Sequence, residues 1–158
     1  MFMKNATLCF LIDKKNKKIL LGMKKRGFGK NKYNGFGGKV KDNEDIKQAA
    51  IRELFEETVV RVHPKNFEKK GDLIFLFPYE IGWNQKVHIF VAESWEGKPI
   101  ETEEMKPEWF DFKDIPFEKM WNDDVYWLPK ILNGKNLKGE FIFGKDNETI
   151  INVNVKEF

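Results

Sequence analysis

The sequence has little of what a disulfide-stabilised or zinc-binding protein needs. Its 158 residues contain one cysteine, Cys9, and two histidines, His63 and His88. One cysteine cannot form an internal disulfide, and these three side chains are too few for a tetrahedral zinc site. Because Cys9 lies in an apolar run, we expect a small buried side chain at this position and not a nucleophile.

Long hydrophobic runs are also missing. No apolar stretch approaches the roughly 20 residues that a membrane-spanning helix requires. The run over residues 6–12 is shorter than most secretory signal cores, and a lysine-rich turn follows it in place of a small-residue cleavage site. We therefore expect a strand there, in a soluble intracellular protein of the cytoplasm that has no membrane partner.

Neither sign of charge is in large excess. The chain has 28 Lys+Arg against 25 Asp+Glu, a formal net charge of +3. Dedicated nucleic-acid binders usually carry a concentrated basic face, so we expect no stable nucleic-acid partner. Local lysines still attract a ligand that carries several phosphates. Since no surplus apolar face is evident, we expect a monomer.

The hydrophobic content of 41%, with 15 Phe and 5 Trp, is enough for a sizeable core in one domain over residues 1–158. Helices are predicted over residues 45–58, with Asp42 or Asn43 as the cap and acids in the first turn, and over 123–132, where Pro129 should kink or shorten the helix. The fold class is α+β, a mixed sheet packed against two helices. Short apolar runs predict strands over residues 7–12, 18–24, 73–79, 86–94, 109–112, 140–143 and 149–155.

Three glutamates of the first predicted helix share one face. At about 100° per residue, Glu53, Glu56 and Glu57 fall together on an arc beside the apolar one. Within the helix, only Glu56 has a cationic partner, Arg52, four residues earlier. Crowded carboxylates repel one another, and a divalent cation among them would offset that cost. A metal site and a solvated acidic surface both remain open as interpretations.

The residues around these glutamates resemble the Nudix box, G-x5-E-x7-R-E-U-x-E-E-x-G-U, where U is a bulky aliphatic residue. The family's glycine is replaced by Val59. That glycine normally ends the helix in a left-handed conformation, which a β-branched residue tolerates poorly, so we expect a departure from the usual helix stop. The residues that match the box are Gly38, Glu44, Arg52, Glu53, Leu54, Glu56, Glu57 and Val60.

Further segments, residues 20–29, 34–40 and 120–124 among them, are similar to the vertebrate MutT homologues within this family. The resemblance implies a hydrolase that uses Mg²⁺, with Mn²⁺ as a possible substitute, to cleave oxidised purine nucleoside triphosphates to monophosphate and pyrophosphate. Such an enzyme clears damaged nucleotides from the precursor pool. The implied catalytic residues are Glu53, Glu56 and Glu57, and the implied metal ligands are these three with Glu104 and the carbonyl of Gly37.

The same resemblance assigns a purine pocket. Trp121 would supply a flat wall, and Asp123 and Asp124 would contact the base edge. Two adjacent buried aspartates cannot easily both ionise, so the pair would offer a donor and an acceptor and accept oxidised guanine or oxidised adenine. A helix cap remains the alternative for the pair. The implied substrate-binding residues are Thr7, Lys24, Phe28, Asn34, Phe75, Trp121, Asp123 and Asp124.

Several alternatives remain for this site. Core packing is an alternative role for Trp121 and Phe75. Tyr33 stands in place of a tryptophan common in the relatives, which leaves the pocket rim and the fine selectivity open. Lys25 and Arg26 either support the phosphates beside Lys24 or are solvated. Rival functions are a Nudix hydrolase for a methylated purine triphosphate, a dinucleoside polyphosphate or ADP-ribose, and an inactive nucleotide- or RNA-binding module. The intact glutamates argue against the inactive module.

Overall fold

The computed structural model describes residues 3–158, which form a mixed eight-stranded sheet and two α-helices. The predicted α+β class is confirmed. The helices are α1 (Ile46–Thr58) and α2 (Asp124–Leu132). The strands are β1 (Lys4–Asp13), β2 (Lys18–Lys24), β3 (Tyr33–Asn34), β4 (Glu68–Leu76), β5 (Gln85–Ala92), β6 (Met105–Asp111), β7 (Leu137–Phe143) and β8 (Ile150–Glu157).

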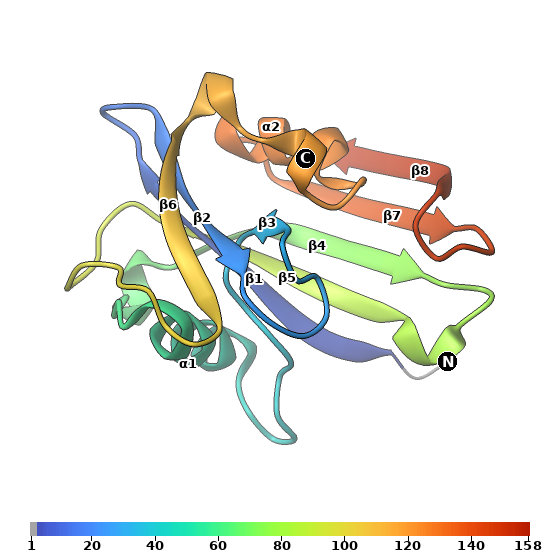
Figure 1. Cartoon of the computed structure of the whole chain (residues 1–158), viewed down its shortest axis with the longest axis horizontal. Helices are drawn as coiled ribbons and strands as arrows, with labels where there is room; N and C mark the ends of the chain where they lie inside the picture. The colour runs from blue at the N-terminus through green and yellow to red at the C-terminus, as the bar shows by residue number, and fades with distance from the viewer. Residues whose placement is uncertain (1–2) are drawn as a thin grey trace.

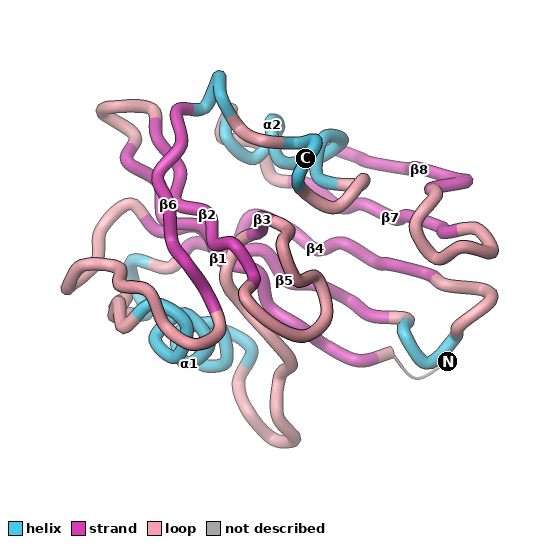
Figure 2. The backbone as a smooth tube through the Cα atoms, viewed as in Figure 1, coloured by secondary structure: helices cyan, strands magenta, loops and turns pink. Residues whose placement is uncertain are grey.

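The strand order along the sheet is β3-β2-β1-β5-β4-β7-β8, and β6 pairs with β2. The pairs β1–β5 and β4–β7 are parallel, and the remaining pairs are antiparallel. Figure 1 shows α1 and α2 on opposite sides of the sheet, with the turns after β4 and β7 at the same edge. Figure 2 shows that the chain between β3 and α1 is almost entirely loop.

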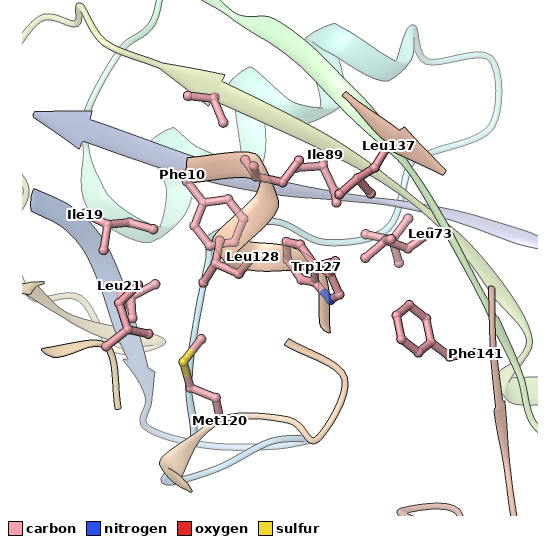
Figure 3. Close-up of a cluster of buried hydrophobic side chains, with 14 of the residues drawn as sticks. Phe10, Ile19, Leu21, Leu73, Ile89, Met120, Trp127, Leu128, Leu137 and Phe141 are labelled. Carbon is pink, nitrogen blue, oxygen red and sulfur yellow. The ribbon is translucent and has the colours of Figure 1, made fainter. Parts of the chain in front are cut away.

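The two faces of the sheet bury separate apolar clusters. Along β1, Phe10 belongs to the cluster that includes Trp127 of α2, whereas its neighbours Cys9 and Leu11 join Leu54 of α1 in the other cluster. This division follows from the alternation of side chains along a strand. In Figure 3, Phe10 lies against Trp127, with a ring-centroid distance of 5.9 Å. Each large side chain buried here stabilises the fold by roughly 1.5–3 kcal/mol. The prediction that Cys9 is buried is confirmed.

The N-terminus of α1 differs from the prediction. Asp45 is the cap, and its carboxylate accepts a hydrogen bond of 3.2 Å from the backbone N–H of Gln48. The predicted caps Asp42 and Asn43 are wrong because Asn43 has φ 64° and turns the chain before the helix begins. The first turn of α1 also contains no acid.

The C-terminus of α1 is the usual stop despite Val59. This residue adopts the left-handed conformation, φ 60° and ψ 13°, and its N–H donates to the carbonyl of Phe55 at 2.8 Å. Thr58 supports the turn, since its hydroxyl donates to the Leu54 carbonyl and accepts from the N–H of Val60. The expected departure is therefore wrong: the buried Val60 and this hydrogen-bonded turn hold Val59 in an unfavourable conformation.

Other boundaries shift by a few residues. The helix α2 continues past Pro129 to Leu132, so Pro129 does not shorten it. The strand β4 begins at Glu68 and β6 at Met105, both earlier than predicted, because polar residues at a strand end carry no alternating apolar signal. Within residues 3–158, no helix has the length and apolar character needed to cross a membrane.

Candidate functional site

A cavity of about 520 Å³ opens between the sheet, the loop after β2, the β4–β5 turn and the chain preceding α2. Its wall brings together all the residues predicted to bind substrate, although they come from distant parts of the sequence. Gly37 and Glu57 also line this cavity. The predicted substrate residues in the wall are Thr7, Lys24, Phe28, Asn34, Phe75, Trp121, Asp123 and Asp124.

Aromatic rings form one wall of the cavity. Phe28 stacks on Trp121, with a centroid distance of 5.0 Å and an interplanar angle of 24°. Phe28 is 66% exposed and also meets Trp83 edge-on at 5.6 Å. The backbone of Gly29, with φ 83°, passes so close that an added Cβ would lie 3.3 Å from the Trp121 ring. The wall offers a planar apolar surface to a ring-shaped ligand.

Asp123 and Asp124 are both almost fully buried in the cavity wall. Burial raises the pKa of each carboxyl, and the charge of Asp123 raises the pKa of Asp124 further. Asp123 accepts a hydrogen bond of 2.8 Å from the indole N–H of Trp127, whereas Oδ2 of Asp124 has no hydrogen-bond partner among the described residues. The pair therefore favours one ionised and one protonated carboxyl.

The structure gives different outcomes for the capping role of Asp123, the core role of Phe75 and the rim position of Tyr33. Asp123 occupies the N-cap position of α2, but within residues 3–158 its side chain makes no capping hydrogen bond, so the helix-cap alternative holds for its position alone. Phe75 lines the cavity and also stacks on the core residue Phe141 at 5.5 Å, so it belongs to both. Tyr33 is absent from the cavity wall in the described part of the chain. Its hydroxyl donates to Glu108 at 3.1 Å.

The glycine turn before α1 lies directly against two of the glutamates. The N–H of Gly37 donates to Oε1 of Glu57 at 2.8 Å. A Cβ added at Gly38 would lie 2.6 Å from Cδ of Glu53, and one at Gly37 would overlap the carbonyl oxygen of Thr7. Gly37 must therefore be glycine, because the clash is with backbone, whereas a side chain at Gly38 would displace the Glu53 carboxylate.

Glu57 is a buried carboxyl among other charges. Its pKa is raised to about 8, chiefly by burial and also by the negative charge of Glu53, against the hydrogen bond from Gly37. Lys24 acts in the opposite direction, and Glu104 adds to the increase. A desolvated carboxyl beside like charges favours a neutralising cation at this place.

Arg52 connects the other acids of the box. Its guanidinium donates to Glu44 at 2.8 and 3.0 Å, to Glu53 at 2.9 Å and to Glu56 at 3.3 Å. These bonds lower the pKa of Glu44 to about 2. Within the helix, the expected pair of Arg52 with Glu56 is joined by a second pair with Glu53, because the fork-shaped guanidinium reaches several carboxylates at once.

Glu104 lies in the loop before β6 and is engaged by cations of the β2 end. Arg26 donates to its Oε1 at 2.9 and 2.6 Å, and Nζ of Lys24 lies 3.5 Å from Oε2. Lys25 pairs with Glu101 at 2.7 Å. Lys24 therefore faces the cavity, while Lys25 and Arg26 hold the 101–104 loop.

In the described residues, no group of three or more Asp, Glu, His or Cys side chains is gathered so as to hold a metal ion. Glu53 and Glu56 are turned to Arg52, and Glu104 to Arg26. The donor chemistry nevertheless fits a hard divalent cation, since carboxylates and the Gly37 carbonyl provide only oxygen ligands. The close Gly38–Glu53 approach and the buried Glu57 carboxyl lie where such an ion would stand.

Sequence reasoning missed several residues of the cavity wall. Trp83 belongs to the turn Ile81–Trp83, Asn147 to the β7–β8 loop, and Trp127 to the core side of α2. Turn residues carry no periodic signal, so their place over a cavity follows only from strand pairing. The spacing of Trp127, one helical turn after Asp123, was the one available clue.

The mixed sheet, the glycine turn and the acidic helix beside a nucleotide-sized cavity define the Nudix class of hydrolases, a class that generally uses divalent metal ions. Among solved structures, a MutT protein from Bacillus halodurans is similar, with a TM-score of 0.80, 26% identity and coverage of 97% of each chain.

The family model described as "NUDIX domain" matches residues 3–131, and the chain belongs to this family. An oxidized purine nucleoside triphosphate hydrolase from Danio rerio is 50% identical over 128 residues, 80% of this chain and 79% of that protein. A protein of the same description from Mus musculus is 44% identical over 142 residues, covering 89% and 87%. The predicted family and class of enzyme are confirmed.

Proposed function

We propose that this chain hydrolyses oxidised purine nucleoside triphosphates to the monophosphate and pyrophosphate, and so clears them from the nucleotide pool. The observation that carries the proposal is one cavity in which Trp121 and the buried Asp123–Asp124 pair share a wall with Gly37 and Glu57. A base site and a phosphate site are thereby joined. The similarity to the Danio rerio and Mus musculus hydrolases supports this substrate class.

The metal of the proposed reaction is Mg²⁺, with Mn²⁺ as a substitute. When bound, it would neutralise phosphate charge and act as a Lewis acid toward the attacking water. The residues that would hold it are Gly37, through its carbonyl, and Glu53, Glu56, Glu57 and Glu104.

The chain's own residues then have separate tasks. Lys24, at the cavity wall, attracts the phosphates. Glu53 or Glu56 accepts the proton of the attacking water. Arg52, through its bonds to both, fixes the direction of their carboxylates. The other carboxylates remain ligands.

Recognition of the base rests on the aspartates. One carboxyl of the pair donates and the other accepts, so the pair matches a purine edge that offers both an acceptor and an N–H. Moving the shared proton would let the same pair bind oxidised guanine or oxidised adenine. Trp121, with Phe28 stacked on it, provides the surface for the ring.

A hydrolysis panel tests the proposal: 8-oxo-dGTP, 2-hydroxy-dATP, methylated purine triphosphates, dinucleoside polyphosphates, ADP-ribose and ordinary dNTPs, with and without Mg²⁺. We expect oxidised purines to be preferred and chelation to abolish turnover. Glu56→Gln should lower kcat by orders of magnitude, whereas Glu118→Gln, an exposed glutamate outside the cavity, should not. Preference for another class would replace the substrate assignment, and no metal-dependent turnover would leave a binding module.

Asp123→Ala separates the base site from the phosphate site. It should weaken hydrolysis of oxidised purines far more than it weakens metal binding. Equal activity on all ordinary triphosphates, before and after the change, would contradict the pocket assignment.

We further propose a monomer that acts in the cytoplasm as one Nudix domain. Sedimentation of the purified protein tests the monomeric state, and imaging of the tagged chain tests the cytoplasmic location.

A further inference from the structure

Asn147 lies in the loop between β7 and β8 and has a defined backbone conformation. Its φ is 58°, in the left-handed region that asparagine tolerates better than most residues. The loop is closed by hydrogen bonds from Asn147 N to Gly144 O at 3.0 Å and from Gly144 N to Thr149 O at 2.8 Å. The side chain of Asp146 also binds the N–H groups of Glu148 and Thr149. The position of Asn147 is therefore fixed by its neighbours.

This loop is joined to the base end of the cavity. The side-chain amide of Asn122, the residue before Asp123, donates to the carbonyl of Glu148 at 3.1 Å. Asn147 and Asp123 line the same cavity. Figure 1 shows the β7–β8 loop at the edge of the sheet where the β4–β5 turn also lies.

The amide oxygen of Asn147 is an unused acceptor. Oδ1 is buried and has no hydrogen-bond partner among residues 3–158. Buried amide oxygens are normally bonded, and an unbonded one is unfavourable unless a ligand or water supplies a donor. Asp124, which also lines the cavity, has a buried and unbonded Oδ2, so two residues of the wall each carry a polar atom with no partner in the described part of the chain.

We propose that Asn147 is a specificity-determining residue whose Oδ1 accepts an N–H from the edge of the bound purine. The inference rests on the proposed function and extends it by adding an acceptor beside the aspartate pair. The N–H is an exocyclic amine or a ring N–H of the kind that oxidation creates at N7 of an 8-oxopurine. A site built to bond an N–H discriminates against bases that lack it, because its acceptor is then left unpaired.

Asn147→Gly tests the role, because glycine keeps the left-handed backbone and removes only the amide. The matched control is Asn43→Gly, since Asn43 has φ 64°, is exposed and lies outside the cavity wall. The measurements are kcat and KM for 8-oxo-dGTP, 2-hydroxy-dATP and dTTP, and calorimetric binding of the oxidised purine monophosphates.

We expect Asn147→Gly to lower kcat/KM for at least one oxidised purine by roughly tenfold, mainly through KM. Binding of the corresponding monophosphate should weaken by a similar factor, with dTTP turnover and Asn43→Gly unchanged. Values within twofold of the wild type for both oxidised purines, or an equal loss on dTTP, would overturn the role of Asn147 alone. Failure of the wild-type enzyme to hydrolyse any oxidised purine triphosphate would overturn the proposed function and this inference with it.

Discussion

The indole N–H of Trp127 donates a 2.8 Å hydrogen bond to Oδ2 of Asp123, one helical turn earlier. Trp127 is fully buried and packs on Phe10, so a core residue is tied to the cavity wall. The bond favours the ionised form of Asp123 and lowers its pKa against the effect of burial. The shared proton of the aspartate pair therefore belongs to Asp124, whose pKa is raised well above its ordinary value by burial and by Asp123.

Trp127→Phe should move the pH profile of the enzyme. The change keeps an aromatic ring in the core but removes the donor, so the pKa of Asp123 rises and the pair gains its second proton at higher pH. The acidic limb of kcat/KM for an oxidised purine triphosphate should shift to higher pH, and the free energy of unfolding should fall by about 1–3 kcal/mol. Trp95→Phe, at a tryptophan outside the cavity wall, is the control. An acidic limb at the same pH as in the wild type would contradict the role of the Trp127–Asp123 hydrogen bond.

Asp124→Asn should stabilise the protein at neutral pH while lowering activity. The folded chain holds a proton on Asp124 that the unfolded chain loses near pH 3.8, so wild-type stability falls as pH rises above that value. Asparagine does not ionise, so the Asp124→Asn variant lacks this loss of stability as pH rises. The melting temperature of Asp124→Asn should exceed that of the wild type at pH 7, and the difference should vanish below about pH 4. Equal melting curves at both pH values would show that Asp124 is ionised in the fold.

The sequence predicted the parts of this molecule that have a periodic or spaced signal. Glu53, Glu56 and Glu57 were placed on one helical face, and the residues inferred for the purine pocket line one cavity. Helix periodicity fixes the first result. The second rests on the resemblance to the Nudix family, because the pocket residues come from distant parts of the sequence. The spacing could not reveal that Arg52 bonds both Glu53 and Glu56, because side-chain direction depends on packing.

Other features required the three-dimensional pairing of strands. Trp83 and Asn147 lie in connections whose sequences indicate turns, and only the β4–β5 and β4–β7 registers bring them to one cavity. The cap of α1 was misplaced by two or three residues because Asp42, Asn43 and Asp45 are all good cap residues. The positive φ of Asn43 excludes a start of α1 at this residue, and no local sequence propensity predicts that φ.

His88 should make the fold less stable in acid. Its side chain is buried, with Nε2 2.9 Å from Oδ1 of Asn5 and Nδ1 2.8 Å from Nζ of Lys69. Burial, aided by the charge of Lys69, lowers its pKa below 6.5, against the effect of Asp72, whose Oδ1 lies 2.9 Å from Nδ1. His88 is therefore protonated more readily in the unfolded chain than in the folded chain. As a result, the free energy of unfolding falls as pH drops below about 6.5.

Thermal unfolding between pH 5 and 8 measures this effect. His88→Gln should flatten the dependence of melting temperature on pH in that window, although the variant loses some stability throughout. His63→Gln, at an exposed histidine, should leave the wild-type slope in place. The same slope in His88→Gln and the wild type would assign the acid sensitivity to other groups.

Val59→Gly should stabilise the protein, which is unusual for the removal of a valine. Val59 has φ 60° and ends α1, and the residue is 38% exposed, so only part of its apolar surface is buried. A β-branched residue in the left-handed region costs about 1–2 kcal/mol, and the greater freedom of glycine in the unfolded chain offsets part of the gain. We expect the free energy of unfolding, measured by urea titration, to rise by roughly 0.5–1 kcal/mol. Val59→Asn should give a smaller rise, because asparagine also tolerates this conformation.

Val125→Gly, at an exposed valine within α2, should instead lower stability by about 0.5–1 kcal/mol. If Val59→Gly lowers stability as Val125→Gly does, then the side chain of Val59 contributes more through its contacts than its backbone costs.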